Sequence, residues 1–113
     1  MKLPNSEQAL VPPEKITAYL LDTEHENGRG KALFFIHFGF SMAQWEVLAA
    51  AIIRHAQEHE VVKQETTRFG TRYVVEGALQ TPNQQAPQVR VVWFIPKDMQ
   101  QPRLATAYPL EES

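Results

Sequence analysis

The sequence contains no cysteine, only five glycines and no long apolar run. Without cysteine, the chain cannot form disulfides, zinc–thiolate sites or a thiol nucleophile, and a cytoplasmic location is expected. The longest apolar run covers residues 47–53, whereas a membrane span needs ~20 residues, so we expect no association with a membrane. The first residues also lack the apolar stretch of a signal peptide.

Positive charge is scarce as well. Lysine and arginine number 11 against 13 acidic residues, which gives a net charge of −2. Nucleic-acid binders are usually basic, because neutralisation of phosphates supplies much of their affinity. Any RNA-binding surface of this chain must therefore be local. The sequence also lacks a phosphate-cradling glycine loop, a Gly-x-Ser-x-Gly elbow and a His-Glu-x-x-His motif, which excludes the common nucleotide-binding, α/β-hydrolase and zinc-protease classes.

The 113 residues fit a single domain, residues 1–113, and 43% of them are hydrophobic, enough for one core. Helices are expected at about residues 13–21, 31–38 and 42–58. Pro12 and Pro13 suit the opening of the first helix, where a missing N–H is no loss. The apolar stripe of this helix is Ile16, Tyr19 and Leu20. Ser41 and Gln44 have the spacing of a capping box at the start of the third helix.

After residue 59 the apolar period changes from 3.6 to 2, which predicts strands at about 60–67, 72–80, 88–95 and 103–108. Residues 68–71 are expected to form a hairpin turn, and residues 9–11 a short strand or packing segment. The sequence therefore predicts an α+β fold, in which N-terminal helices pack on a four-stranded antiparallel sheet. The residues expected to be nearly buried between them are Trp45, Leu48, Ile52, Val75, Val91 and Trp93.

Histidine is the side chain best suited to proton transfer near neutral pH, and two histidine positions stand out. His25 lies in a predicted loop with Arg29 and Lys31 close behind, and these cations could hold a phosphate. The alternative for His25 is an ordinary exposed loop residue. His55 and His59 share one face of the third helix, but no third ligand is identifiable, so no metal or other cofactor is expected.

Polar side chains also share one face of the predicted sheet. Arg72, Glu76 and Arg90 have like parity on neighbouring strands, so they form either a functional cluster or a solvated face stabilised by opposite charges. Thr106 and Tyr108 share a face of the last strand, and both can hydrogen-bond a phosphate or a 2′-hydroxyl. The alternative for Tyr108 is a place in the core or its rim.

Segments along nearly the whole chain resemble a family of small bacterial domains. The matching segments are residues 2–5, 15–21, 24–35, 38–45, 70–75, 92–95 and 102–109. That family in turn is similar to the barnase/EndoU/colicin/RelE-like nuclease superfamily, whose members act as bacterial toxins. The resemblance implies a RelE/barnase-like plan, with helices followed by a four-stranded antiparallel sheet whose face binds RNA. It also implies cleavage of RNA without a metal, by attack of the 2′-hydroxyl on its own phosphate.

The resemblance further suggests roles for five residues, which should meet in one cleft. His25 would be the general base or acid, Lys31 and Arg72 would stabilise the phosphate, and Thr106 and Tyr108 would orient the phosphate or the 2′-hydroxyl. The partners would be RNA and a cognate antitoxin or immunity protein. The competing interpretation is a non-catalytic binding module of the immunity or antitoxin type, which the acidic balance favours. A third is an oligomeric structural protein that pairs through sheet edges.

Overall fold

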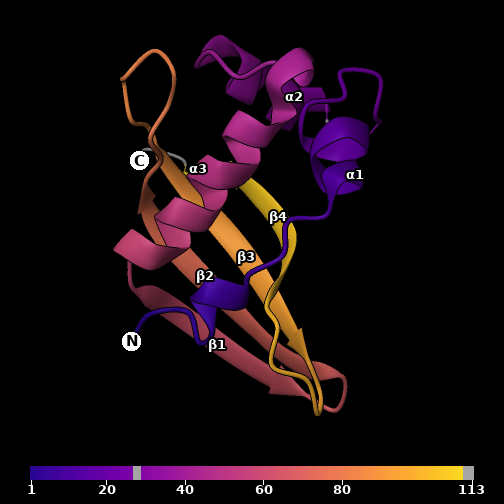
Figure 1. The fold of residues 1–113 in the computed structure, drawn as a ribbon, viewed down its shortest axis with the longest axis vertical. Coiled ribbons are helices and arrows are strands. Elements are labelled where there is room, and N and C mark those ends of the chain that lie inside the picture. The colour runs from indigo at the N-terminus through magenta and orange to yellow at the C-terminus, as the bar shows by residue number, and fades with distance from the viewer. Residues whose placement is uncertain (27–28, 111–113) are drawn as a thin grey trace.

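The computed structural model describes residues 1–26 and 29–110, and it has helices on one side of a four-stranded antiparallel sheet (Figure 1). The strand order follows the chain, β1-β2-β3-β4. The strands are β1 (Val61–Thr67), β2 (Gly70–Ala78), β3 (Gln88–Pro96) and β4 (Arg103–Pro109). The predicted α+β fold is confirmed, and each predicted strand is present within two residues of its expected limits.

The three predicted helical segments are present as well. The helices are α1 (Pro13–Lys15), which continues as a π-helical turn (Ile16–Leu20), α2 (Arg29–His37), and α3 (Trp45–Glu58), which follows a 3-10 turn (Met42–Gln44). The Ser41 hydroxyl accepts a hydrogen bond from the Gln44 backbone N–H at 3.3 Å, which is the first half of the predicted capping box. No single helix among the described residues is long and apolar enough to cross a membrane. By length and composition alone, α2 and residues 42–58 pass that test as a pair bent by 80°.

The hairpin between β1 and β2 is tighter than the sequence suggests. Thr67 pairs with Gly70, so the turn consists of Arg68 and Phe69 alone. The φ angle of Gly70 is 149°, and a Cβ there would lie 2.3 Å from the Ile95 carbonyl oxygen. Glycine is therefore required by the close approach of β2 to β3, rather than by a turn. The sequence pattern placed Gly70 in the turn because it is a glycine, so the predicted start of the strand at residue 72 was two residues late.

The N-terminal segment covers the outer edge of β4. The Leu10 N–H donates to the Pro102 carbonyl at 2.8 Å, and the Leu104 N–H donates to the Leu10 carbonyl at 3.0 Å. Residues 9–11, expected to be a short strand or a packing segment, thus form a single parallel bridge, between Leu10 and Arg103, and no full strand. Further along this segment, the Lys15 ammonium donates a hydrogen bond to the Ala105 carbonyl of β4 at 3.1 Å. As a result, the π-helical turn that follows Lys15 lies beside β4 (Figure 1).

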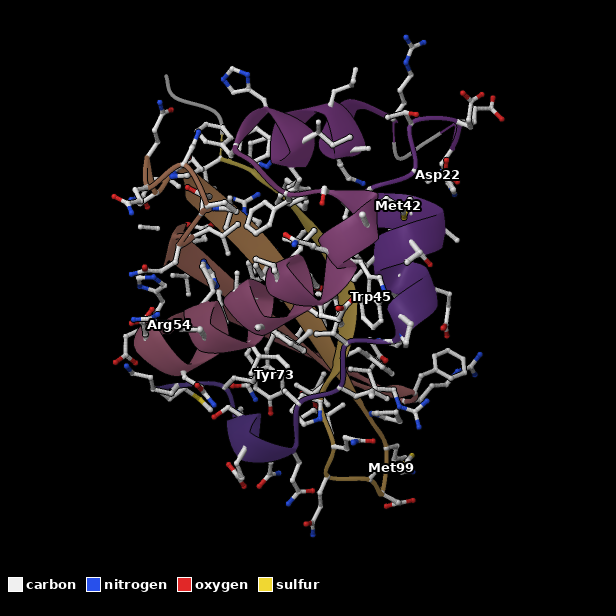
Figure 2. All side chains as sticks on the ribbon, turned by 45° about the horizontal axis from the view of Figure 1, so that its top comes forward. Asp22, Met42, Trp45, Arg54, Tyr73 and Met99 are labelled. Atoms are coloured by element: carbon white, nitrogen blue, oxygen red, sulfur yellow. The ribbon has the colours of Figure 1, made fainter. Side chains whose placement is uncertain are left out.

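The core lies between α3 and the face of the sheet that α3 crosses (Figure 1). Of the six residues predicted to be nearly buried, Leu48, Ile52, Val75, Val91 and Trp93 have no exposed surface. The prediction is wrong for Trp45, which is only half-buried. Trp45 lies in the first turn of α3, where the helix approaches the N-terminal helical segment at the rim of the core (Figure 2).

Two histidines fix the C-terminal part of α3 to β2. The Nε2 atom of His55 lies 3.1 Å from the Gly77 carbonyl oxygen, and that of His59 lies 2.8 Å from the Ala78 carbonyl oxygen. The helix approaches so closely that a Cβ on Gly77 would lie 2.4 Å from the His59 ring. Among the described residues, no group of three or more His, Asp or Glu side chains could hold a metal ion. The pair therefore has a structural role in joining helix and sheet.

The opposite face of the sheet carries the polar side chains expected there. Arg90 on β3 pairs with Glu76 on β2 and with Tyr108 on β4, and Val92 pairs with Thr106. These residues alternate with the core residues Val91 and Ala107, so they point away from α3. This outer face, together with the helices beside β4, provides the candidate site.

Candidate functional site

Tyr19 lies at the meeting point of three separate segments. It belongs to the π-helical turn Ile16–Leu20, and its hydroxyl is hydrogen-bonded to the Thr106 hydroxyl of β4 at 3.3 Å. The Lys31 ammonium, from the first turn of α2, donates a hydrogen bond to the same Tyr19 hydroxyl. One phenolic oxygen thus joins the π-helical turn, α2 and the outer face of the sheet. The sequence had assigned Tyr19 to an apolar stripe, but the structure leaves its side chain only half-buried.

Two ammonium groups flank the Tyr19 ring. The Lys31 Nζ lies 4.8 Å from the ring centroid of Tyr19, and the Lys15 Nζ lies 5.7 Å from it. Lys31 also lies 5.9 Å from the ring centroid of Tyr108, so it stands between the two tyrosines. Cations at these distances are attracted to aromatic rings, and they favour ionisation of a nearby phenol.

These contacts change the acidity of Tyr19. Burial by itself would raise the pKa of the phenol, because it disfavours the charged form. Hydrogen bonds from Lys31 and Thr106, with the charges of Lys31 and Lys15, outweigh burial, so the pKa of Tyr19 is lowered below its usual range. The contacts with Lys31 and Thr106 thus favour the ionised form of the phenol. Such a shift beside a cation is typical of functional sites.

His25 also contacts the Tyr19 ring. Its ring packs edge-on against the Tyr19 ring, with the centroids 5.0 Å apart and an interplanar angle of 70°. The preceding turn is shaped by Asp22, whose carboxylate accepts a hydrogen bond from the Glu24 N–H at 2.9 Å. The His25 carbonyl in turn accepts a hydrogen bond from the Arg29 N–H at 3.0 Å, at the start of α2. The loop is thus held so that an imidazole meets the tyrosine.

Tyr108 is tied to a charged pair on the outer face of the sheet. The Arg90 Nε donates to the Glu76 carboxylate at 2.6 Å, and the Arg90 Nη1 donates to the Tyr108 hydroxyl at 3.3 Å. The Arg90 guanidinium also lies 5.6 Å from the centroid of the Tyr108 ring. The predicted cross-strand cluster is present for Glu76 and Arg90, and it extends to Tyr108. Arg72, the third predicted member, shares this face but pairs with Glu65 and Phe94 at the other end of β2.

The outer face is hollowed between Arg72 and Tyr108. The hollow has a volume of about 270 Å³ and is lined from β1 by Lys63 and Glu65, from β2 by Arg72 and Glu76, and from the neighbouring strands by Arg90 and Tyr108. Of the five predicted site residues, His25, Lys31 and Thr106 contact Tyr19, and Lys31 links them to Tyr108, whose ring centroid lies 5.9 Å from its ammonium. Arg72 lies across the hollow from Tyr108, apart from the residues that contact Tyr19.

Residues 2–111 match the model of a protein family described as a domain of unknown function (DUF6883). The chain belongs to this family. Its fold is similar to a chain in a solved structure described as a contact-dependent growth inhibition toxin–immunity protein complex from Klebsiella pneumoniae 342. The TM-score is 0.68 with 19% sequence identity, over 88% of this chain and 98% of that one. At this identity the likeness shows the fold alone. Comparison with curated proteins finds no match.

Sequence patterns of this DUF6883 domain did not single out Tyr19 or Lys15. Tyr19 follows Ile16 at the spacing of an apolar stripe, and a tyrosine can bury its ring while its hydroxyl stays at the surface. One signal was available, because Lys15 precedes Tyr19 by four residues and helical residues at this spacing lie side by side. The contact with Thr106 spans 87 positions of the chain and depends on the docking of the first helix beside β4.

Proposed function

We propose that this domain is a metal-independent ribonuclease of the bacterial toxin type, which cleaves RNA by attack of a 2′-hydroxyl on the adjacent phosphodiester. The observation that supports this most directly is the contact of His25, Lys31 and Thr106 with Tyr19, where Lys31 also lies 5.9 Å from the ring centroid of Tyr108. Transesterification needs a proton acceptor, a proton donor and a cation for the charge that develops on the phosphate. The cluster contains side chains suited to all three tasks.

Each side chain has a role in this proposal. Lys31 stabilises the phosphate undergoing reaction, and His25 carries a proton. Thr106 and Tyr108 orient the phosphate and the 2′-hydroxyl through their own hydroxyl groups. Arg72, across the hollow of the outer sheet face, binds a neighbouring phosphate of the same strand. The RNA thus lies along the open face of the sheet, which fits recognition of single strands by side chains on a sheet surface.

The likeness to a chain of a toxin–immunity complex supports a role in a toxin system, with a cognate inhibitory protein as partner and cytoplasmic RNA as substrate. The resemblance of the sequence to the nuclease superfamily adds to this support. Fold alone does not determine chemistry, so the side-chain cluster carries more weight than the likeness.

The test is cleavage of RNA by the purified protein in the presence of EDTA, with Lys31→Met and the matched control Lys97→Met. Lys97 lies on the turn between β3 and β4 and is exposed. We expect cleavage without divalent metal, a loss of about 10²- to 10³-fold in Lys31→Met, and no comparable loss in Lys97→Met. Intact RNA both with and without divalent metal would contradict the proposal.

A second candidate function is a non-catalytic immunity or antitoxin-like protein. The net charge of −2 favours it, because acidic proteins commonly shield the basic surface of a nuclease. The complex named above contains an immunity protein as well as a toxin, and the shared fold is compatible with either role. The same assay separates the two functions. An immunity protein leaves RNA intact and protects growing cells from a co-expressed toxin, whereas a ribonuclease slows their growth when expressed alone.

A further inference from the structure

We infer that Tyr19 is the catalytic proton acceptor of this site and that His25 is therefore its proton donor. This inference rests on the proposed ribonuclease function, and it assigns to a tyrosine the role that sequence patterns left open to His25. The contacts of the Tyr19 hydroxyl, the charges around its ring and the contact of that ring with His25 support these roles.

The contacts of the hydroxyl provide the first argument. Lys31 donates to the Tyr19 oxygen, and the Thr106 hydroxyl lies 3.3 Å from the same oxygen. When Tyr19 is ionised, its oxygen can accept from both groups, so the two contacts stabilise the ionised form more than the neutral form. The bond to Lys31 is charge-assisted, which is the stronger class of hydrogen bond.

The surrounding charges act in the same direction. The ammonium groups of Lys31 and Lys15 lie 4.8 Å and 5.7 Å from the centroid of the Tyr19 ring. Both attract a phenolate. The lowered pKa of Tyr19 agrees with this geometry, since the two lysines and Thr106 outweigh the opposing effect of burial. The sequence contains three tyrosines, and Tyr19 is the one flanked by two lysines at the site.

The position of Lys31 decides which group donates the proton. Acid and base must act on opposite sides of the phosphorus in an in-line displacement. Lys31 is bonded directly to the Tyr19 hydroxyl, so it lies on the same side as the acceptor and serves to stabilise charge. The His25 ring packs against the Tyr19 ring, with centroids 5.0 Å apart, and imidazole is the side chain best suited to give up a proton near neutral pH.

In the cleavage step, one phosphorus–oxygen bond forms while another breaks. The 2′-oxygen of one nucleotide bonds to the phosphorus of its own 3′-phosphodiester, and its proton passes to the Tyr19 phenolate oxygen. The bond from phosphorus to the 5′-oxygen of the next nucleotide breaks, and this oxygen takes a proton from the His25 imidazolium. The products are a 2′,3′-cyclic phosphate and a free 5′-hydroxyl. Exchange with water returns Tyr19 to phenolate and His25 to imidazolium, and no electron is gained or lost.

The first test measures ionisation of Tyr19 without relying on activity. We expect a pH titration of the phenolate ultraviolet absorbance to show one tyrosine that ionises below the other two. This early step should vanish in Tyr19→Phe, which keeps the ring, and should move to higher pH in Lys31→Met. Tyr73→Phe is the matched control, because Tyr73 is buried on the α3 side of the sheet and belongs to the core. An early step that persists in Tyr19→Phe would overturn the inference.

The second test separates acceptor from donor through the leaving group. A nucleoside 3′-(para-nitrophenyl phosphate) has a leaving group that needs no proton, whereas a dinucleotide requires one. Tyr19→Phe should lose about 10²- to 10⁴-fold on both substrates. His25→Gln should lose a similar factor on the dinucleotide but little on the nitrophenyl ester. The matched controls, Tyr73→Phe and His37→Gln, should cleave both substrates at close to the wild-type rate.

The outcomes distinguish the two proposals. A wild-type protein that cleaves neither substrate contradicts the ribonuclease function and the inference with it, even if Tyr19 ionises early. A wild-type protein that cleaves both, with Tyr19→Phe equal to Tyr73→Phe, contradicts the inference alone. The reversed pattern, in which the nitrophenyl ester rescues Tyr19→Phe but not His25→Gln, would exchange the two roles and overturn the inference.

Discussion

At the scale of single residues, His55 links the stability of the protein to pH. Its side chain is 1% exposed, and its Nε2 atom lies 3.1 Å from the Gly77 carbonyl oxygen. Burial lowers the pKa of His55 to about 4, and the charge of the neighbouring His59 adds to this shift, while the bond to Gly77 and the charge of Glu58 oppose it. Because the folded state holds this pKa below that of the unfolded chain, protonation favours unfolding.

We therefore expect His55 to contribute fully to stability above about pH 6.5, and this contribution to fall as the pH decreases toward about 4. Between about pH 7 and about pH 5 the loss should be about 2 kcal/mol. His55→Gln keeps an N–H donor but does not titrate, so it should lack this part of the pH dependence. Urea unfolding across this pH range measures the difference, with His37→Gln as the exposed control. Equal pH dependence in wild type and His55→Gln would contradict the expectation.

Some residues of the candidate site could be identified from the sequence, and others could not. His25 and Lys31 were identifiable by residue type, and Thr106 and Tyr108 by their shared parity on a strand. Tyr19 was not, because an aromatic ring at an apolar position has the pattern of a core residue. Its hydroxyl stands out only through its hydrogen bonds with Thr106 and Lys31, which lie on other elements. Residue types thus indicate which acids, bases and cations a site can contain. Tertiary contacts are needed to show which side-chain atom joins them.

At the scale of elements, the periodicity of apolar residues predicted where the helices and strands lie along the chain. α3 and the four strands lie where the 3.6- and 2-residue patterns place them. The pattern did not reveal features that depend on a distant neighbour, such as the close approach of β2 to β3 that leaves no room for a side chain at Gly70. The attachment of α3 to β2 belongs to the same class, because it needs a residue without a side chain at Gly77.

Gly77→Ala should therefore destabilise the protein. The new Cβ would lie 2.4 Å from the His59 ring, so α3 would have to move away from the carbonyl groups of Gly77 and Ala78. Overpacking of this kind costs about 1–3 kcal/mol. Gly30→Ala is the matched control, because nothing lies within 4 Å of a Cβ there and alanine favours a helix. Thermal unfolding compares the two variants, and equal midpoints would contradict the predicted contact between Gly77 and His59.

At the scale of the whole molecule, the cations of the candidate site lie in two small groups. The net charge is −2, yet Lys15 and Lys31 lie together at Tyr19. Arg90 is bound to Glu76, so that pair adds little net charge to the outer face. At the other end of the hollow, Lys63 is likewise paired with Glu65, and Arg72 lies beside this pair. A ribonuclease with this surface should depend on a short row of phosphate contacts rather than on a broad basic patch.

The salt dependence of RNA binding tests this arrangement. If Lys15, Lys31 and Arg72 each neutralise one phosphate, the logarithm of the binding constant should fall with the logarithm of salt concentration with a slope of about −2, since each contact on a single strand contributes about −0.7. Fluorescence anisotropy with a 2′-methoxy RNA, which cannot be cleaved, measures this slope. Lys31→Met should make the slope shallower by about 0.7, the contribution of one phosphate contact, and Lys97→Met should leave the slope unchanged. A slope as steep as about −5 would instead require a broad basic surface, which a chain with more acidic than basic residues could supply only through contacts outside the site.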